Sequence, residues 1–277
     1  MTVHTQIRAA SVVAVLNFLK PMAERPRTLQ YEPEPGIPQR NAEDEAHLVS
    51  IHDARPLAPT LSLDVQGFEY LHAPTSFAAY NDDAAIRSFY YPKVQRHLAA
   101  ATGARQVIAF DHNVRNAARA ASGEAGIRGP VPRTHNDFTA KSGRERVLAE
   151  LRARGLDPSL LDGRFAIVNL WRPIGRNVEK WPLALVDART LAADDLVATD
   201  LVYRDRVGET YSLGFSPGQR WYYFPQLAPD EAILIKGYDS QEEGVARFAA
   251  HSAFEDPQSP ANARERESIE VRALVIY

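Results

Sequence analysis

The sequence predicts a mainly β protein with flanking helices, arranged as a jelly-roll barrel. Apolar residues recur at helical spacing in the first half of the chain, whereas residues 164–277 carry repeated short strand patterns separated by turn residues. Helices first and many short strands afterwards is the order expected when helices pack on the outer face of such a barrel. With 277 residues, 45% of them hydrophobic, the chain can bury one large core. We therefore expect a single domain over residues 1–277.

The first 60 residues predict an extended N-terminal arm. Residues 2–19 are apolar enough to pack onto the body as a strand or a short helix. Residues 20–60 contain seven prolines and many charges, so this segment cannot hold long helices. We expect it to cross the surface, with a part in a lid over a pocket as the alternative. Residues 61–277 would then hold the helices and the jelly-roll core.

Helical and strand patterns alternate over residues 61–155. Residues 82–102 have apolar side chains at helical spacing and end at Gly103, a favourable helix C-cap, while Pro92 is expected to divide this helix in two. A second amphipathic helix is predicted over 143–155, and strands over 61–71 and 106–110.

Strand patterns dominate the remainder of the chain. Strands are predicted over 164–172, 183–187, 200–203, 209–215, 220–225, 232–236 and 271–277. On the first of them, Asn169 and Trp171 share one face and Arg172 lies on the other. Periodicity does not decide which face lines the barrel, so all three are candidate substrate-binding residues.

Composition excludes several classes of function. The formal charge of −3 shows no basic excess, so we expect no nucleic-acid partner. The chain has no cysteine, which excludes disulfides, zinc–thiolate sites, iron–sulfur clusters and cysteine nucleophiles. The apolar stretch at 9–19 is too short to span a bilayer and lacks a leader pattern, so we expect no membrane association and a cytoplasmic location.

The strongest chemical signal is His135-Asn136-Asp137, which follows Gly129-Pro130-Val131-Pro132. In a strand, side chains at i and i+2 leave the same face, so His135 and Asp137 can converge while Asn136 points away. They would supply two thirds of a 2-His-1-carboxylate facial triad, the set that binds iron(II) and leaves coordination positions open.

A third ligand must come from elsewhere in the chain. His251 is the one histidine downstream of Asp137 and is therefore the first candidate. His112 is the rival, but its carboxylate neighbour Asp111 is adjacent in sequence, and adjacent residues of a strand face opposite ways. A hydrogen-bonded structural role is favoured for His112.

A possible anion site follows His251. Arg266 and Ser268 would share one face of a strand, where a guanidinium fork and a hydroxyl suit a carboxylate. Because Glu270 and Arg272 continue the same polar face, the alternative is a solvent-exposed face of an edge strand. Arg264 and Arg272 are the other candidate carboxylate clamps.

The ordered set His135-x-Asp137, His251 and Arg266-x-Ser268 resembles the signature of iron(II)/2-oxoglutarate-dependent dioxygenases. Further segments resemble the secondary-metabolism hydroxylase/desaturase branch, which includes gibberellin desaturase-like, cephamycin hydroxylase-like and fungal endoperoxidase-like proteins. The supporting segments are 103–107, 110–115, 169–173, 182–185, 238–240 and 268–272, and the resemblance covers residues 65–277. The interval from His251 to Arg266 is longer than in plant hydroxylases of the superfamily.

The resemblance implies a double-stranded β-helix, the cupin-like barrel, in which His135, Asp137 and His251 act as metal ligands and catalytic residues. It implies iron(II), 2-oxoglutarate as cosubstrate bound by Arg266 and Ser268, and O2. The implied reaction is oxidation of a C–H bond of a small secondary metabolite, with hydroxylation, desaturation or cyclisation as the outcome. The branch and the sequence leave the substrate and the oligomeric state open.

Two other functions remain as alternatives. One is a non-catalytic jelly-roll protein that binds a small molecule, and the other is a metal-dependent hydrolase that uses the same triad for zinc. A zinc hydrolase has no need of a dicarboxylate clamp, so the Arg266-x-Ser268 pair favours the oxygenase.

Overall fold

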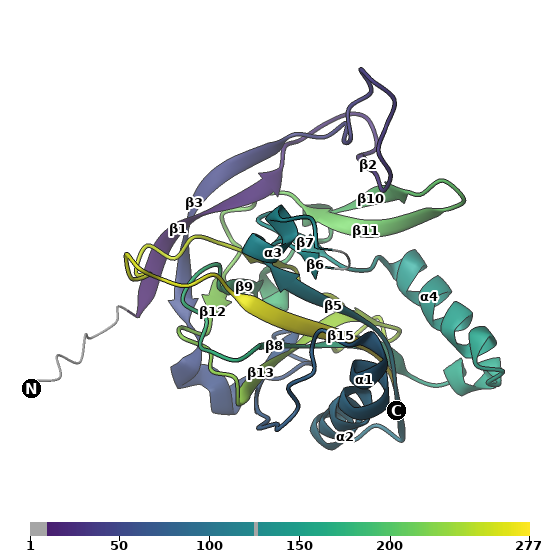
Figure 1. Ribbon diagram of the computed structural model, residues 1–277. Coiled ribbons are helices and arrows are strands. Elements are labelled where there is room, and N and C mark those ends of the chain that lie inside the picture. Colours follow the sequence, from purple (N-terminus) through teal and green to yellow (C-terminus); the bar gives the residue numbers. More distant parts are fainter. Residues whose placement is uncertain (1–9, 125–126) are drawn as a thin grey trace, which may run out of the picture.

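Two β-sheets and a few helices make up the protein. The structure is a computed structural model that describes residues 10–124 and 127–277. One sheet has the order β1 (Ser11–Leu19), β3 (Asp44–Asp53), β12 (Trp221–Tyr223), β9 (Leu183–Val186), β14 (His251–Ala253), β7 (His135–Asn136), β11 (Val207–Leu213), β10 (Leu196–Val202) and β2 (Arg27–Leu29). The other has the order β4 (Phe68–His72), β13 (Glu231–Asp239), β8 (Phe165–Pro173), β15 (Glu267–Ile276), β5 (Gln106–Asn116) and β6 (Ile127–Arg128). The predicted mainly β architecture with flanking helices is confirmed (Figure 1).

The chain passes repeatedly from one sheet to the other. Strands β8, β13 and β15 lie together in the six-stranded sheet, whereas β9, β12 and β14, which come between them in sequence, lie in the nine-stranded sheet. Apolar side chains of the two sheets meet between them, among them Trp171 and Ile233 from one sheet and Leu183 and Leu185 from the other. Segments distant in sequence are thereby brought to one interior.

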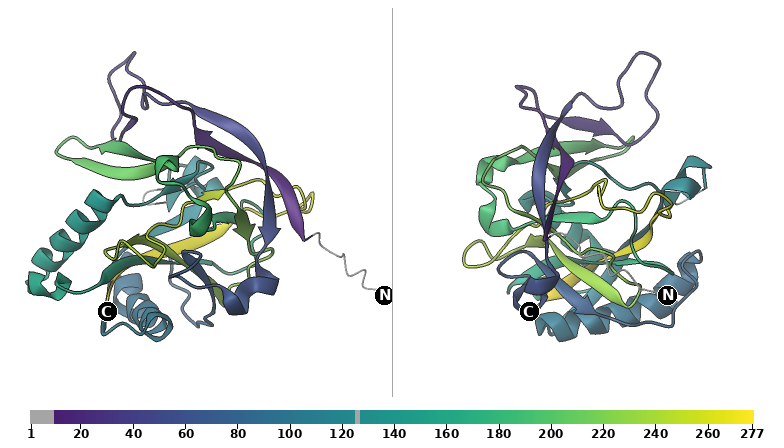
Figure 2. Two further views of the ribbon diagram at one scale, coloured as in Figure 1. Left: turned by 180° about the vertical axis from the view of Figure 1, so that it is seen from behind. Right: turned by 90° about the vertical axis from the view of Figure 1, so that its left-hand side faces the viewer.

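Helices cover the outer face and one end of the six-stranded sheet. Helix α2 (Tyr91–Thr102) buries Val94 and Leu98 against that face, and α4 (Ala140–Ala153) buries Val147 and Leu151 against its end. Helix α4 and the β1–β3 pair lie on opposite sides of the molecule (Figure 2). The smaller helices are η1 (Arg55–Thr60), α1 (Asp83–Ala85), η2 (Ile86–Tyr90), α3 (Ala117–Ala121), η3 (Pro158–Leu161), η4 (Ala188–Thr190) and η5 (Ala193–Asp195).

The prediction that Pro92 divides its helix is wrong. Residues 83–102 are helical throughout, with the π-helical turn η2 directly before α2, and Gly103 ends the helix in the left-handed conformation at φ 68°. In this turn the Tyr91 amide donates to the Ile86 carbonyl, one residue further back than in an α-helix. Proline lacks an amide hydrogen, and its place at the start of α2 makes that loss cheap.

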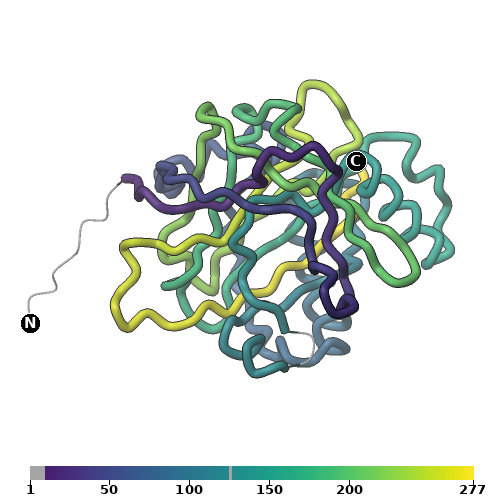
Figure 3. Tube along the Cα trace, turned by 90° about the horizontal axis from the view of Figure 1, so that it is seen from above, coloured from purple at the N-terminus to yellow at the C-terminus, as the bar shows by residue number. Residues whose placement is uncertain are grey.

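The N-terminal segment is more than a surface arm. Strand β1 pairs antiparallel with β3 from Ser11 opposite His52 to Leu19 opposite Asp44, and β3 joins the sheet beside β12. Strand β2, from the loop between them, pairs with β10 at the other end of the same sheet. Seen from above, this purple and blue segment crosses the face of the molecule (Figure 3). The charged ends of β3 obscure its strand pattern in the sequence. The prediction that residues 20–60 hold no long helix is confirmed. Residues 2–9 of the predicted first element lie outside the described residues.

Predicted strands differ from the structure mainly in length. The strand expected over 61–71 is confined to β4, because residues before it turn through Gly67, at φ 82°. Strand β5 continues to Asn116, beyond the predicted end at 110, since it pairs along the whole of β15. Strand β15 lies between β8 and β5, so the alternative of a solvent-exposed edge strand for its polar face does not hold.

Candidate metal centre

The short strand β7 directs His135 and Asp137 into the interior. His135 lies opposite Ser212 of β11 on one side and opposite His251 of β14 on the other. Asn136 points away and is buried, and its side-chain amide donates to the carbonyls of Phe138 and Gly237 at 2.6 and 2.8 Å. These two hydrogen bonds hold Asn136 in place and fix the alternation that puts its two neighbours on the same side.

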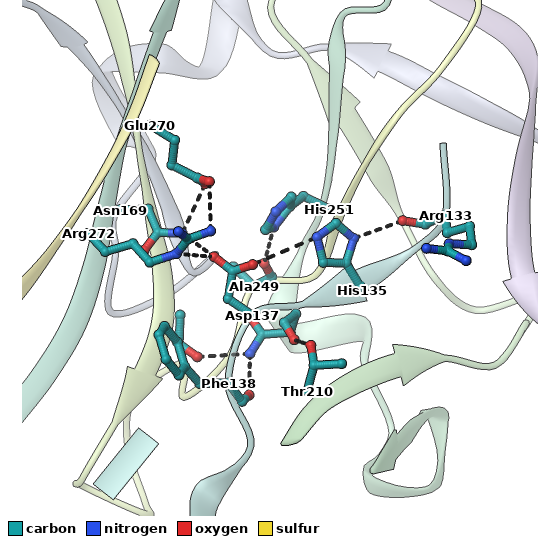
Figure 4. A network of polar contacts seen from close by, with 12 residues as sticks. Arg133, His135, Asp137, Phe138, Asn169, Thr210, Ala249, His251, Glu270 and Arg272 are labelled. Carbon is teal, nitrogen blue, oxygen red and sulfur yellow. Dashed lines mark hydrogen bonds and ion pairs between the residues drawn. The ribbon is translucent and has the colours of Figure 1, made fainter. Parts of the chain in front are cut away.

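The pairing of β14 with β7 brings the third candidate ligand into place. One ligand atom each from His135, Asp137 and His251 lies within 4.8 Å of the other two, and the two imidazole centroids are 4.6 Å apart. The three side chains converge in Figure 4. The predicted juxtaposition of distant side chains is present, and His112 is elsewhere, with its Nδ1 2.9 Å from the Tyr91 hydroxyl.

Each histidine is oriented by a carbonyl two residues before it. Nδ1 of His135 lies 2.8 Å from the Arg133 carbonyl, and Nδ1 of His251 lies 3.2 Å from the Ala249 carbonyl. A carbonyl only accepts, so Nδ1 carries the proton and Nε2 keeps a free lone pair. Burial, and then the nearby His251, lower the pKa of His135 to about 3, against the attraction of Asp137. The His135 imidazole is therefore neutral at physiological pH, as a metal ligand must be.

Asp137 is held by two donors on one oxygen. Asn169 Nδ2 donates to Oδ2 at 2.7 Å and Arg272 Nε donates to the same oxygen at 2.9 Å. Burial by itself would raise the pKa of Asp137, but Arg272, His251 and His135 outweigh it and lower that pKa well below its usual range. Glu270 completes the network through Asn169 Nδ2 and Arg272 NH2, each at 3.0 Å. The other Asp137 oxygen, Oδ1, lies 3.8 Å from His135 Nε2 and makes no hydrogen bond within residues 10–124 and 127–277.

This donor set fits iron(II). Two imidazoles and one carboxylate on one side of a site are the facial triad of non-haem iron oxygenases, and the other coordination positions stay open. The carboxylate network resembles the outer-shell partners that usually orient metal ligands. Among the described residues, this trio is the group of histidines and carboxylates with metal-binding geometry.

Arg266 is a buried cation beside the triad. Its side chain is 3% exposed, its NH1 donates to the Trp181 carbonyl, and its Cζ lies 5.3 Å from the Trp171 ring centroid. It makes no ion pair among the described residues, and Nε has no partner there. Burial, and then the charge of Arg115, lower the pKa of Arg266 to about 9. Arg266 shares a small cavity with His135, His251 and Trp171, so it offers a guanidinium to an anion beside the triad.

The other predicted site residues are distributed around this arrangement. Ser268 of β15 is buried two residues after Arg266, which directly precedes that strand, and the Ser268 hydroxyl has no hydrogen-bond partner in the described part of the chain. Arg272 is committed to Asp137, and Arg264 is exposed, so neither replaces Arg266. Arg172 lies on the face of β8 opposite to Asn169 and Trp171, where its NH2 donates to the carbonyls of Ala73 and Pro229. This position does not support a contact between Arg172 and the substrate.

Sequence reasoning missed Glu270, Arg115 and Arg133 as part of the site. The alternation of residues 266, 268, 270 and 272 places Glu270 on a polar strand face. It predicts Glu270 in the site only if β15 is known to be a central strand. Arg115 lies at both cavities beside the triad, and Arg133 lines the larger one. No local pattern marks these two arginines, because their positions follow from strand pairing.

A larger cavity of about 420 Å³ opens next to the triad. His135, Asp137 and Phe138 lie in its wall, and strands β5, β10 and β11 contribute further lining. Thr28, Gln30, Arg40 and Asp44 of the N-terminal segment also line it. The volume falls within the usual range of small-molecule sites, about 300–1,000 Å³.

Comparisons with known proteins agree with this geometry. The family model described as "YDMC: Oxidoreductase/YMDC permease-like domain" matches residues 16–276. The Fe(II)/2-oxoglutarate-dependent dioxygenase nvfI of Aspergillus novofumigatus is 35% identical over 271 residues, 93% of this chain and 94% of that protein. The alpha-ketoglutarate-dependent dioxygenase tstK of Talaromyces stipitatus is 33% identical and covers 83% of this chain and 84% of its own length.

A solved structure shows the same fold. The iron and alpha-ketoglutarate-dependent endoperoxidase NvfI superposes with a TM-score of 0.85 at 31% identity, covering 96% of this chain and 98% of that one. The predicted jelly roll, or double-stranded β-helix, is confirmed by this likeness, as are iron(II), 2-oxoglutarate and O2 as the cofactor and cosubstrates of the family. This chain belongs to the Fe(II)/2-oxoglutarate-dependent dioxygenases.

Proposed function

We propose that His135, Asp137 and His251 hold iron(II) and that Arg266 binds the far carboxylate of 2-oxoglutarate, so that the enzyme oxidises a C–H bond of a small secondary metabolite. The observation that carries this proposal is the convergence of the three ligand atoms within 4.8 Å of one another. When bound, iron(II) with 2-oxoglutarate and O2 supplies the oxidant for the C–H bond. The protein supplies binding, orientation and exclusion of water.

Each side chain has a distinct task in this proposal. His135 and His251 present Nε2 to the metal because their Nδ1–H groups donate hydrogen bonds to backbone carbonyls. Asn169 and Arg272 hold one Asp137 oxygen, which leaves Oδ1 for the metal. Arg266, buried without an anionic partner among the described residues, gains one when the far carboxylate of 2-oxoglutarate reaches the small cavity. Ser268, two residues further on, has a hydroxyl without a hydrogen-bond partner among the described residues and is proposed as the second donor to that carboxylate.

The larger cavity is the proposed substrate site. His135 and Asp137 line this cavity. Of the predicted substrate-binding residues, Asn169 donates a hydrogen bond to Asp137, and Trp171 lines the small cavity. Relatives include the hydroxylase/desaturase efuI of Hormonema carpetanum, 30% identical over 83% of both chains. The size of the cavity supports a small metabolite as substrate, and the relatives' names support hydroxylation or desaturation as the reaction. A cytoplasmic location is also proposed, since a chain without cysteine gains nothing from an oxidising compartment.

Anaerobic titration tests the assignment directly. Iron(II) is added to the purified protein, followed by 2-oxoglutarate, and the weak visible charge-transfer band of the chelate is recorded. We expect the band in the wild type and its loss in His251→Ala. A wild-type protein that forms no band, or a His251→Ala variant that keeps it, would rule out the proposed centre.

A further inference from the structure

We infer that the substrate is an organic anion, a carboxylate or a phosphate monoester, whose charged group binds arginines of the larger cavity. This inference rests on the proposed function, because it places the substrate in the cavity next to the proposed iron centre. It is drawn from the balance of charges around that cavity.

Cations outnumber anions in the wall of the cavity. Seven arginines and three aspartates line it, and the structure contains no lining lysine or glutamate among the described residues. The aspartates are already paired: Asp44 forms two hydrogen bonds with Arg40, and Asp137 and Asp111 both contact Arg272. The remaining arginines therefore find no carboxylate in the cavity wall.

Two of these remaining arginines have carboxylate partners outside the cavity. Arg146 pairs with Glu150 along α4, and Arg206 contacts Asp205 at 3.8 Å. Arg146 and Arg206 are therefore not counted among the cations that lack a carboxylate partner.

Arg115, Arg128 and Arg133 make no ion pair within the described part of the chain. Arg115 NH1 donates only to the Gly129 carbonyl, at 3.0 Å, and burial lowers the pKa of Arg115 although Glu270 opposes that shift. Arg133 comes two residues before His135, its carbonyl lies 2.8 Å from His135 Nδ1, and it lines the large cavity together with His135 (Figure 4). Arg128 lies on β6, which pairs with β5 at Arg115. Three unpaired cations around one cavity attract an anion from solution.

The anion in question is distinct from 2-oxoglutarate. Arg266 lines the small cavity and is absent from the lining of the large one, whereas Arg128 and Arg133 line the large cavity and are absent from the lining of the small one. The large cavity also offers an apolar surface, from Val131, Phe138, Leu201 and Tyr203, to the uncharged body of the substrate. A guanidinium binds planar carboxylates and phosphates through paired hydrogen bonds, so both anions fit this site.

The test measures binding to the loaded enzyme without turnover. The holoenzyme, with iron(II) and saturating 2-oxoglutarate under anaerobic conditions, is titrated calorimetrically with a panel of small carboxylates and phosphate monoesters. Each acid is paired with its primary amide, and each phosphate with its parent alcohol. The variants are Arg128→Gln, Arg133→Gln, their double variant and the charge-preserving Arg133→Lys. Arg204→Gln serves as the matched control, because Arg204 stacks on Tyr31 and does not line the cavity.

We expect anions to bind at least about tenfold more tightly than their neutral partners, because a hydrogen bond from a guanidinium to an anion is stronger than one to a neutral group. The double variant loses that preference, whereas Arg133→Lys and Arg204→Gln keep most of it. The carboxylate and phosphate arms show which anion the site takes. Higher ionic strength weakens the anions alone.

The inference is overturned if no anion binds, if amides bind as well as acids, or if the double variant keeps the preference. It is also overturned if the double variant weakens 2-oxoglutarate in parallel, since the arginines would then serve the cosubstrate. The chelate band, recorded in the same samples, separates the two levels: a normal band without anion preference refutes the inference alone, and a missing band refutes the proposed function.

Discussion

At the scale of single residues, the site depends on which charges have partners. Asp137 is neutralised by Arg272 and oriented by Asn169, whereas Arg266, only 3% exposed, makes no ion pair among the described residues. A buried charge without a partner is costly, and in an enzyme it marks the place where a charged ligand completes the structure.

The first prediction concerns the proposed clamp. Arg266→Ala should weaken 2-oxoglutarate binding by about 10- to 100-fold, because a charge-assisted hydrogen-bonded contact is lost. Iron(II) affinity should change little, since Arg266 does not contact a proposed ligand. Anaerobic titration of the chelate band gives both constants. Arg264→Ala is the control, because that side chain is exposed two residues earlier; equal 2-oxoglutarate affinity in wild type and Arg266→Ala would contradict the assignment.

The second prediction concerns the orientation of Asp137. Asn169→Ala removes the 2.7 Å hydrogen bond to Oδ2, and we expect iron(II) affinity to fall about 10- to 100-fold, as is typical of outer-shell partners. Isothermal titration under anaerobic conditions measures this loss. Asn41→Ala is a suitable comparison, because Asn41 also makes side-chain hydrogen bonds but lies in the N-terminal segment. An unchanged iron(II) affinity in Asn169→Ala would show that Arg272 alone orients the carboxylate.

At the scale of elements, helix α4 is docked by a close approach that only glycine permits. A Cβ placed on Gly143 would lie 2.5 Å from Cγ of Tyr238, on strand β13. Tyr238 contributes to the apolar cluster that holds Val147 and Leu151 of the same helix. The helix follows directly after the segment with His135 and Asp137, so its docking fixes one end of that segment.

The third prediction follows from this contact. Alanine favours the helix over glycine by about 1 kcal/mol. Gly143→Ala should nevertheless lower the free energy of unfolding by about 2 kcal/mol overall, because the Tyr238 ring must move. Chemical denaturation measures the difference. Gly163→Ala, where nothing lies within 4 Å of the added carbon, should leave stability nearly unchanged. A more stable Gly143→Ala protein would mean that propensity outweighs packing at this contact.

At the scale of the whole molecule, an ion pair joins the N-terminal segment to the six-stranded sheet. Arg55 of η1 donates to both carboxylate oxygens of Glu231 on β13 at 2.8 Å, and Tyr70 of β4 donates at 2.7 Å. Burial would raise the pKa of Glu231, but the hydrogen bonds from Arg55, Tyr70 and the Ala228 amide lower it to about 2.

The fourth prediction is a pH dependence of stability. A depressed folded-state pKa contributes stability that is fully present above the ordinary value of 4.5 and is lost as the pH falls toward 2. We expect Arg55→Gln to lower the free energy of unfolding by about 2 kcal/mol at pH 7, and the difference from wild type to shrink through that acid window. Denaturation at a series of pH values checks this. A difference that stays constant from pH 7 to pH 3 would show that Arg55 acts by packing.

The amino-acid sequence by itself predicts two of the three proposed metal ligands and most of the strands of the barrel. The His135-x-Asp137 alternation needs only the two-residue period of a strand, and most strands after residue 164 follow from short alternating patterns. Those signals are local, since they depend on neighbours within a few positions. Strand β3 escaped notice because its charged ends obscure the alternation of Val49 and Ile51, which becomes meaningful only beside β1.

Tertiary structure alone decided which distant side chains meet. No local period links His251 to His135; the antiparallel pairing of β14 with β7 places them opposite each other. The same holds for the polar face of β15, which became the wall of the site because β8 and β5 flank that strand, and for Arg172, which the pleat of β8 turns away from the triad. Sequence determined the types of side chain available and their local alternation. Sheet order and register, which arise from contacts across the whole chain, determined that two histidines, one aspartate and an unpaired arginine share one interior.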